Sequence, residues 1–441
     1  MAAIPKQGEN YIMQPGDVLS RIAVVAYGDA GKWKIIADAN GIVDEKKIPI
    51  GRVIYIPPET APEELKPASG PPQPEPPAPA IVPPAVKEPA KKINKPKGAI
   101  TLILEGREVR VSAGRLGHGL DQMCRQWACD IPFIPKKDPW LDEVTARGSF
   151  AAGELYFGPE LVATGKLYER TISGTDNESK KTLTFASAAA DMVDSSLWPA
   201  NSEIRDCNLK QIAEKIMGSA GFKFTFIDPP GAAFPMIQCK EVETVAAYFQ
   251  RLAGQRGLFI STDEEGTVIF QKLHDNAPPV ANIVYGESRS VTAYSVTFND
   301  RLRFREYHAA NTAADGTGIE ADVTDPTVKG PRQIIFDAAN CNSADIVTAA
   351  EWVMIQSNME AFSFTLPLAT WWDDNGEIFK DNTKIILSAP ILDIKQPSPF
   401  IIRAVEFSFT PDSRTAALSL VPPLHIEGGR LKGSIPDADG K

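Results

Sequence analysis

Residues 11–57 read YIMQPGDVLSRIAVVAYGDAGKWKIIADANGIVDEKKIPIGRVIYIP. Pro15-Gly16 marks a turn after a short first strand, and Asp17 stands where a helix N-cap is expected. Apolar residues then follow at helical spacing, at Leu19, Ile22, Ala23 and Ala26. This part of the stretch therefore predicts a strand, a turn and an amphipathic helix.

The rest of the stretch predicts a second helix and a closing strand. Trp33, Ile36 and Ala37 share one helical face, and Asn40-Gly41 is a typical helix end. The segment 53–56 then favours a strand that is able to pair with the first one. We therefore expect a βααβ domain within residues 1–60, whose roughly 47 ordered residues are near the lower size limit for an independent core.

This stretch resembles a lysin motif (LysM) over its whole length. The resemblance implies a groove between the turn after the first strand and the segment before the second, contacted by Gly16, Asp17, Leu19, Asn40 and Ile42. Cell-wall members of the family bind N-acetylglucosamine polymers there, so peptidoglycan is one expected ligand. The segment YGDAGKWKIIADAN also resembles LysM units of contractile-tail proteins, in which this surface docks another protein. The groove is therefore a candidate site for a glycan or for a protein.

Residues 61–98 are expected to form a proline-rich linker. The segment 57–98 holds 14 prolines in 42 residues, in runs such as GPPQPEPPAPAIVPP. Such a composition favours polyproline II, an extended conformation that rises about 3.1 Å per residue. We interpret the segment as a spacer, and a proline-rich ligand for another domain is the alternative.

The composition of the 441-residue chain indicates a large globular protein. Apolar residues make up 43% of the sequence, enough for packed cores, yet no apolar run reaches the roughly 18 residues of a membrane helix. The N-terminus MAAIPKQGEN lacks a signal-peptide pattern, so we expect cytoplasmic synthesis and no membrane partner. Five scattered cysteines do not indicate a disulfide framework. The net charge of -10 argues against specific DNA binding, which needs clustered Lys and Arg.

Three regions follow the linker. Residues 99–200 and 283–425 show short alternating strand patterns separated by glycine-rich turns, which is typical of antiparallel β domains. Residues 201–282 instead predict a small α+β module that contains a capping box at Asn208 and Gln211. The last β region also predicts a helix over 343–357, and residues 426–441 are expected to be a disordered tail.

Two local patterns complete the prediction of secondary structure. Apolar residues at helical spacing in the first β region predict a short helical insert, at Leu120, Met123, Cys124 and Trp127. The segment 311–329 is polar and rich in Gly, Asp and Thr, which favours an exposed loop. We therefore expect an α+β protein that is mostly β.

The order of elements in three stretches is the basis for a second resemblance. The stretches are LVATGKLYERTISG with KTLTFASAAADMVDSS, NLKQIAEKIMGSAGFKFTF with TVAAYFQRLAGQRGLFISTDEEGTVIFQK, and the C-terminal run that begins LPLATWWDDNGEIFKDNTKIILSAP. From about residue 99 to 423 the chain resembles the baseplate hub proteins of contractile phage tails, the gpP-like family of Mu-type phages. The LysM and the linker that precede this region depart from the family pattern.

This second resemblance implies a homotrimer. Each subunit would contribute two tube-like β-barrel domains, 99–200 and 283–425, to a ring of six, with the 201–282 module outside the ring. Such a ring adapts a sixfold tail tube protein to a threefold tail spike protein, and the LysM would dock to baseplate wedge or sheath proteins. The resemblance places the chain in the virion, in a tail baseplate assembled in the host cytoplasm. DNA would pass only through the lumen, without specific binding.

The sequence predicts no catalytic, cofactor or metal site. The histidines stand apart from one another without a metal-ligand spacing, at His118, His274, His308 and His425. Cys124 and Cys129 are spaced so that their thiols do not share a helix face. Asp373, Asp374 and Glu377 are carboxylates of the kind that glycosidases use, but DDNGE is also typical of a polar turn, which we favour.

The competing hypothesis is a peptidoglycan-binding, cell-wall-associated protein or hydrolase that is anchored by its LysM. The missing secretion signal and the missing catalytic geometry argue against this hypothesis. Binding of the N-terminal domain to peptidoglycan or to tail components separates the two.

Overall fold

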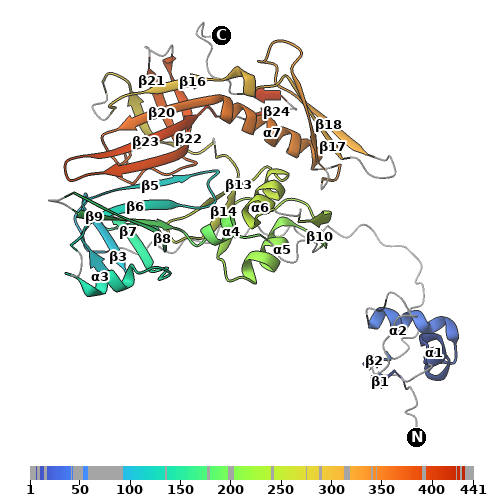
Figure 1. Ribbon diagram of the computed structural model, residues 1–441. Helices are drawn as coiled ribbons and strands as arrows, with labels where there is room; N and C mark the ends of the chain where they lie inside the picture. Colours follow the sequence, from blue (N-terminus) through green and yellow to red (C-terminus); the bar gives the residue numbers. More distant parts are fainter. Residues whose placement is uncertain are drawn as a thin grey trace, which may run out of the picture. The chain divides into compact units, whose positions relative to one another are not determined.

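The computed structural model divides into two units, which we call the N-terminal unit and the body (Figure 1). The first lies within Met1–Ile81 and the second within Val82–Lys441, and each is described by itself. The described residues are 6, 10–13, 17–40, 42, 53–57, 93–134, 137–175, 179–196, 203–239, 243–274, 276–287, 291–311, 318–338, 341–343, 345–389, 394–423, 425–427 and 430–432. Most of the segment expected to be a linker therefore lies outside the described residues.

The N-terminal unit contains the expected two strands and two helices. Its elements are β1 (Asn10–Ile12), α1 (Leu19–Tyr27), the 3-10 turn η1 (Ala30–Lys32), α2 (Trp33–Ala39) and β2 (Val53–Tyr55). β1 and β2 pair antiparallel, and the core between them and the helices includes Leu19, Ile36 and Ile54. Val18 holds the N-cap position of α1, one residue later than expected, while the Asp17 carboxylate accepts a 2.8 Å hydrogen bond from the Tyr11 hydroxyl.

The first β-rich region of the body is an antiparallel sheet. Its strands are β3 (Ile100–Leu104), β4 (Arg107–Val109), β5 (Ala113–Gly119), β6 (Gln126–Pro132), β7 (Ala152–Phe157), β8 (Glu160–Gly174) and β9 (Ser179–Ala186). They pair in the order β5-β6-β9-β8-β7-β3-β4, and the helix α3 (Pro139–Val144) precedes β7. Residues 93–98, which were expected in the linker, pack on this sheet, where the Ile93 amide donates to the Pro159 carbonyl at 3.0 Å.

The second β-rich region has a closely similar arrangement. Its strands are β15 (Pro279–Val284), β16 (Ser295–Phe298), β20 (Phe362–Leu368), β21 (Lys384–Ala389), β22 (Ile394–Phe409) and β23 (Arg414–Val421). They pair in the order β16-β20-β23-β22-β21-β15, and only the β15–β21 pair is parallel. Figure 1 shows this region against the first one, with β22 and β23 beside β5 and β6.

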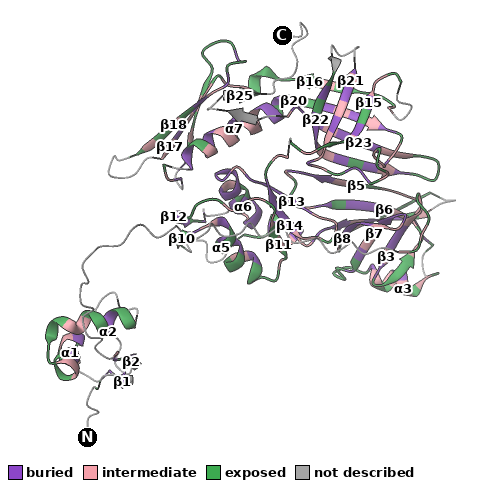
Figure 2. Cartoon of the chain, turned by 180° about the vertical axis from the view of Figure 1, so that it is seen from behind, coloured by how far each residue is buried: buried purple, intermediate pink, exposed green. Residues whose placement is uncertain are grey.

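The two regions form one 13-stranded sheet, because β5 pairs with the second half of β22. The two regions that were expected to be tube-like β-barrel domains, 99–200 and 283–425, are therefore joined by one continuous sheet. Among the described strands, no pairing closes either region on itself. The two regions also share one apolar core, visible as the buried strand interiors in Figure 2, in which Phe157 of the first region stacks on Trp371 of the second.

The hairpins β8–β9 and β22–β23 match residue by residue. The pair Leu167 and Phe185 of the first hairpin corresponds to Ile402 and Leu420 of the second. A register shift then follows at the same place in both hairpins, directly after Leu167 and directly after Ile402. The offset between corresponding residues stays constant along both strands. The two regions are therefore structural repeats of one unit, with the order β5-β6-β9-β8-β7 in the first and β16-β20-β23-β22-β21 in the second.

The turns before β7 and β21 confirm this correspondence. Phe150 and Asn382 both have positive φ values, 44° and 57°, although neither is glycine. The following residues, Ala151 and Thr383, each accept a backbone hydrogen bond at the bulge of the long strand, at 2.9 Å and 2.8 Å. The repeats differ at β3 and β15, since β3 pairs antiparallel to β7 whereas β15 pairs parallel to β21.

An α+β module lies between the two repeats in the chain. It contains α4 (Ala190–Asp194), β10 (Glu203–Cys207), α5 (Leu209–Ala213), the π-helical turn η3 (Glu214–Gly218), β11 (Phe224–Phe226), β12 (Phe234–Gln238), α6 (Val245–Gly254), β13 (Phe259–Thr262) and β14 (Val268–Gln271). β10 pairs with β12, and β11, β14 and β13 form a second small sheet. The predicted capping box is confirmed, because Asn208 and Gln211 exchange side-chain to backbone hydrogen bonds of 3.0 and 2.9 Å.

A five-stranded sheet takes three strands and a long helix from the chain between β16 and β20, and its other two strands from the chain after β23. Its elements are η4 (Asp300–Leu302), β17 (Glu306–Asn311), β18 (Ile319–Thr324), β19 (Gln333–Asp337), α7 (Ile346–Ala361), β24 (His425–Glu427) and β25 (Arg430–Lys432). The segment 311–329 is therefore not a loop throughout, since β18 lies within it and buries Val323. The helix expected over 343–357 is α7, and β25 lies within the expected tail, of which residues 433–441 are outside the described part.

The helical insert expected around Leu120–Trp127 is wrong. β5 ends at Gly119 and β6 begins at Gln126, with turns between them. The apolar residues point into three different cores, Trp127 into the sheet, Met123 into the α+β module and Leu120 toward α7. Their helical spacing therefore arises because three cores meet here.

Candidate assembly interfaces and a polar junction

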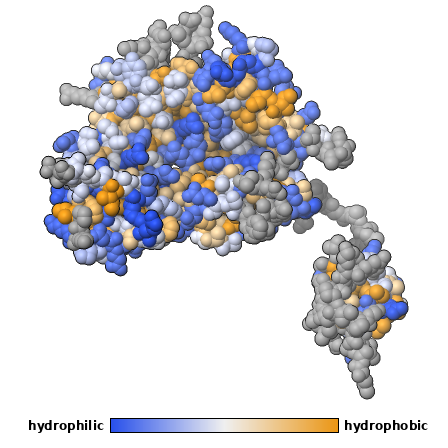
Figure 3. Space-filling view, viewed as in Figure 1, coloured by the Kyte–Doolittle hydropathy of each residue, from blue (hydrophilic) through white to orange (hydrophobic). Residues whose placement is uncertain are grey.

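Several edges of the 13-stranded sheet lack a partner strand among the described residues, and those of β16 and of the second half of β8 correspond to the two strands that pair at the internal junction, β5 and β22. β16 pairs only with β20, and residues 167–174 of β8 pair only with β9. Both edges expose large apolar side chains, with Phe298 of β16 at 60% and Ile172 of β8 at 59% exposure. Open strand edges with apolar residues favour pairing with a further strand. Figure 3 shows that hydrophobic patches also lie among hydrophilic ones on the visible face of the body.

The junction of β5 and β22 shows how one repeat meets the next. Val405 stands opposite His118 and Phe407 opposite Leu116, and all four residues are buried. A backbone hydrogen bond of 2.8 Å from Leu120 to Arg403 extends the pairing. The junction thus combines a strand ladder with a continuous apolar layer.

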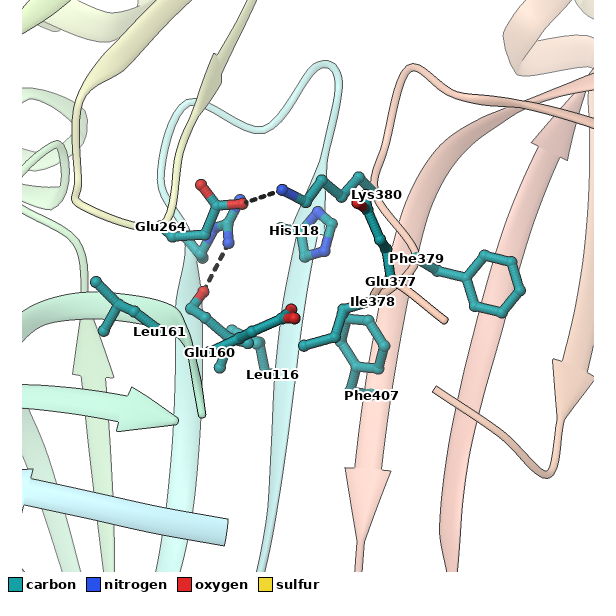
Figure 4. Close-up of a pocket in the computed structure, with 12 residues that line it drawn as sticks. Leu116, His118, Glu160, Leu161, Glu264, Glu377, Ile378, Phe379, Lys380 and Phe407 are labelled. Atoms are coloured by element: carbon teal, nitrogen blue, oxygen red, sulfur yellow. Dashed lines mark hydrogen bonds and ion pairs between the residues drawn. The ribbon is translucent and has the colours of Figure 1, made fainter. Parts of the chain in front are cut away.

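A polar cavity of about 180 Å³ lies where both repeats meet the α+β module (Figure 4). It is lined by Leu116, His118, Arg125, Glu160, Leu161, Val162, Glu264, Glu377, Ile378, Phe379, Lys380 and Phe407. Figure 4 shows Lys380 reaching toward Glu264, and the two form an ion pair of 3.0 Å. The buried Arg125 guanidinium donates to the carbonyls of Val162 at 2.6 Å and Thr262 at 2.9 Å, so it connects the first repeat to the module.

Two positive charges at this cavity keep Glu264 ionised. Burial alone would raise the pKa of Glu264, but the positive charges of Arg125 and Lys380 outweigh burial and lower this pKa to about 2. Burial and the Arg125 charge lower the pKa of His118, even though its Nδ1 lies 2.7 Å from Asp381. His118 is therefore neutral near pH 7, and the arrangement is a structural network that joins three parts of the body.

The other polar residues singled out in the sequence have local structural partners. His274 lies 3.1 Å from Asp228, and His308 lies 2.6 Å from Asp322. The side chain of His425 is outside the described part. No group of three or more His, Cys, Asp or Glu among the described residues is placed to hold a metal ion.

The DDNGE segment is a turn, as expected. Asp373 accepts hydrogen bonds from the amides of Asn375 and Glu377, both at 2.9 Å, and Asp374 accepts one from Asn282 at 2.8 Å. None of the five cysteines, all of which lie in the described part of the chain, forms a disulfide, and Cys129 is fully buried. No helix among the described residues is long and apolar enough to cross a membrane.

The expected groove residues of the N-terminal unit have different environments. Leu19 is fully buried in the core, whereas Asp17 and Ile42 are half-buried. Asn40 connects α2 to β2, because its amide donates to the Tyr55 carbonyl at 2.6 Å and accepts from the Tyr55 amide at 2.7 Å. Gly16 lies outside the described residues.

The α+β module is similar to a known protein domain. Residues 189–272 match the family described as "Baseplate hub protein gp44-like, second domain". The module is therefore similar to a domain of baseplate hub proteins. Over 284 residues the chain is 22% identical to baseplate hub protein gp44 of Escherichia phage Mu. The aligned region covers 61% of this chain and 74% of that protein.

Two solved structures share the fold. The 43 kDa tail protein of prophage MuSo2 from Shewanella oneidensis matches with a TM-score of 0.62 and 22% identity, over 73% of this chain and 98% of that chain. The tail protein from Neisseria meningitidis MC58 matches with a TM-score of 0.62 and 16% identity, over 73% of this chain and 95% of that chain. The fold of most of this chain is therefore that of phage tail proteins.

Sequence reasoning did not find the polar junction or the open edges. Arg125, Glu264 and Lys380 are far apart in the chain, and only the fold brings them together. The sequence pattern does not mark the open edges either. Ile172 and Phe298 resemble other apolar strand residues, and only the strand order shows that they lie at an edge.

Proposed function

We infer that this chain is a structural baseplate hub protein of a phage tail or of a tail-derived machine. The match of residues 189–272 to the second domain of gp44-like hub proteins supports this function. The similarity to hub protein gp44 of phage Mu extends that support to 61% of the chain. The chain is accordingly a virion component that works by assembly with other tail proteins.

The hub acts as a homotrimer in which three chains supply six related wall segments. The observation that carries this proposal is the internal repeat, with equivalent strand orders, equivalent bulges and the equivalent turns at Phe150 and Asn382. Two repeats in each of three chains make a ring with threefold symmetry that approximates sixfold symmetry. A closed ring also covers strand edges that would otherwise favour aggregation.

The approximate sixfold symmetry fits the partners that a hub requires. One face of the ring meets a sixfold tail tube protein, and the other meets a threefold tail spike protein. DNA passes through the lumen without specific contacts, which agrees with a net charge of -10, since an acidic wall does not hold phosphates.

The mass of the full-length chain in solution tests the trimer. Light scattering behind size exclusion should give three times the 47.8 kDa chain mass for this chain alone, and a larger mass that still contains three copies of it when the tail spike protein is bound. A chain that stays monomeric at high micromolar concentration in the presence of its spike protein would overturn the proposal.

The N-terminal LysM-like unit docks to a baseplate wedge or sheath protein. The support comes from α1, where Val24 and Val25 are 48% and 56% exposed side by side, since neighbouring exposed apolar residues suit a protein contact. Asp17 and Asn40 offer half-buried polar side chains, and Ile42 a half-buried apolar one, for a peptidoglycan fragment.

Pull-down of full-length variants separates the two ligands. Val25→Glu should reduce retention on wedge or sheath proteins at least tenfold, whereas Asp17→Ala should leave it unchanged. Saturable binding to purified peptidoglycan that is lost in Asp17→Ala, together with no retention on tail components, would instead support the glycan.

A further inference from the structure

We propose that β16 of one chain pairs antiparallel with the second half of β8 of a neighbouring copy, with Thr297 opposite Thr171. This inference rests on the proposed trimer and specifies the contact that builds it. It follows from the internal repeat, because β16 corresponds to β5 and β8 corresponds to β22. In each chain β5 already pairs with β22, while the equivalent edges of β16 and β8 have no partner strand among the described residues.

The register of the proposed pairing can be read from the internal junction. There Glu406 of β22 stands opposite Gly117 of β5. Glu406 corresponds to Thr171, because the two occupy the same position in the matched hairpins β22–β23 and β8–β9. Gly117 pairs with Gln126 of β6, and the matching pair in the second repeat is Thr297 with Ser363 of β20. Thr171 therefore stands opposite Thr297 of the neighbouring copy.

The same correspondence places apolar residues together on the core side of the junction. Phe407 stands opposite Leu116 inside the chain, so the equivalent Ile172 stands opposite Val296 of the neighbouring copy. By the same step, Arg170, whose guanidinium donates to the Ala146 carbonyl at 3.1 Å in the single chain, stands opposite Phe298 of the neighbouring copy. Both strands thus bring a complementary set of side chains to the contact.

The open edges of β8 and β16 expose side chains whose equivalents on β22 and β5 are buried. Phe407 is fully buried by β5, whereas its equivalent Ile172 is 59% exposed. His118 is 4% exposed beside β22, whereas its equivalent Phe298 is 60% exposed. A strand laid on each edge would remove this apolar surface from water and pair the open backbone groups.

The turn beside the proposed β8 edge has the same backbone conformation as its counterpart at the internal junction. Phe150 lies beside the proposed β8 edge, where its ring contacts Tyr168 with centroids 5.8 Å apart. Its counterpart Asn382, in the same left-handed conformation, lies beside β22 in the internal junction, where β5 is accommodated. The backbone turn that lies beside β22 at the internal junction is therefore repeated beside β8 at the open edge.

Disulfide trapping in the full-length chain tests the register. Facing residues of antiparallel strands have Cα atoms about 4.5–5.5 Å apart, within the range of a disulfide. Thr171 and Thr297 are both exposed, so Thr171→Cys with Thr297→Cys should leave the single chain folded. Mild oxidation should convert most of this double variant to covalent dimers and trimers. Each single variant and the unchanged chain, which contains five native cysteines, should give at least tenfold less.

The matched control shifts one cysteine by one residue. Thr171→Cys with Val296→Cys places the two thiols on opposite faces of the sheet and should cross-link at least tenfold less. A native trimer that forms the shifted bond as readily, or forms neither bond, would overturn the proposed pairing while the trimer itself stands. A chain that stays monomeric without oxidant and forms no cross-link would overturn both.

Discussion

The rings of Phe157 and Trp371 stack with their centroids 4.1 Å apart and an interplanar angle of 20°. Phe157 ends β7 of the first repeat, and Trp371 follows β20 of the second, so the stack joins the two repeats. Phe407 and Phe409 of β22 contact the Trp371 ring edge-on, and the indole N–H donates to the Thr415 carbonyl at 3.0 Å. The joint between the repeats is therefore an aromatic core.

Removing Trp371 should destabilise the body strongly. Trp371→Ala empties a fully buried site at the joint, and truncations of this kind cost about 3–5 kcal/mol. Urea unfolding followed by circular dichroism measures the loss. Trp371→Phe, which keeps an aromatic ring in the stack, should lose less. Trp140→Ala is the control, since Trp140 is half-buried in α3, and an equal loss there would contradict the special role of the joint.

A pair of glycines makes room for the aromatic side chains of the first repeat. A Cβ on Gly165 would overlap the Ala186 carbonyl and lie 2.8 Å from the Trp127 ring, and a Cβ on Gly153 would lie 2.5 Å from Phe185. Gly165→Ala should therefore destabilise the body by about 1–3 kcal/mol through overpacking. Gly117→Ala is the matched control in β5, because a Cβ there meets nothing within 4 Å. The melting temperature should fall for the first variant and stay constant for the second.

Much of the α+β module could be predicted from the sequence because its signals are local. The capping box of Asn208 and Gln211 and the turn of Asp263 and Gly266 depend on residues a few positions apart. The joining of the two repeats could not be predicted in this way. Phe409 and Gly114 stand opposite each other although they lie near opposite ends of the body in the sequence. No local sequence pattern specifies that pairing.

The internal repeat and the open strand edges could not be predicted from local sequence patterns either. The repeat is almost invisible in the sequence, because corresponding positions such as Leu167 and Ile402 keep only their apolar character. What the repeats share is the placement of bulges and positive φ values, which several residue types adopt, as Phe150 and Asn382 do. The open edges could therefore be recognised only after strand order and register were known.

Acidification should weaken the junction between the repeats and the module through Glu264. Its pKa is about 2 in the folded chain and 4.5 ordinarily, so the unfolded chain takes up a proton first as pH falls. The stabilisation is complete well above pH 4.5 and is lost as pH falls through 4.5 toward 2, by about 3 kcal/mol in total. Free energies of unfolding measured across this window should fall less steeply in Glu264→Gln. Glu265→Gln, a change at the exposed neighbouring carboxylate, should keep the slope of the unchanged chain.

A charge on the open edge of β8 should prevent assembly without unfolding the chain. Ile172 is 59% exposed in the single chain, so Ile172→Asp should leave the circular dichroism spectrum of the folded chain unchanged. In the proposed contact, however, the carboxylate would be buried opposite Val296 of the neighbouring copy, which is costly without a partner charge. The concentration at which trimers dissociate, measured by light scattering on dilution, should rise at least tenfold.

Ile335→Asp is the matched control for this variant. Ile335 is 68% exposed on β19, in the five-stranded sheet, and it has no place in the proposed contact. Its trimers should dissociate at the same concentration as those of the unchanged chain. If the two variants weaken the trimer equally, the effect is one of surface charge and the β8 edge is not the interface. If Ile172→Asp alone weakens it, and Phe298→Asp does the same from the β16 side, the two edges meet each other in the assembled ring.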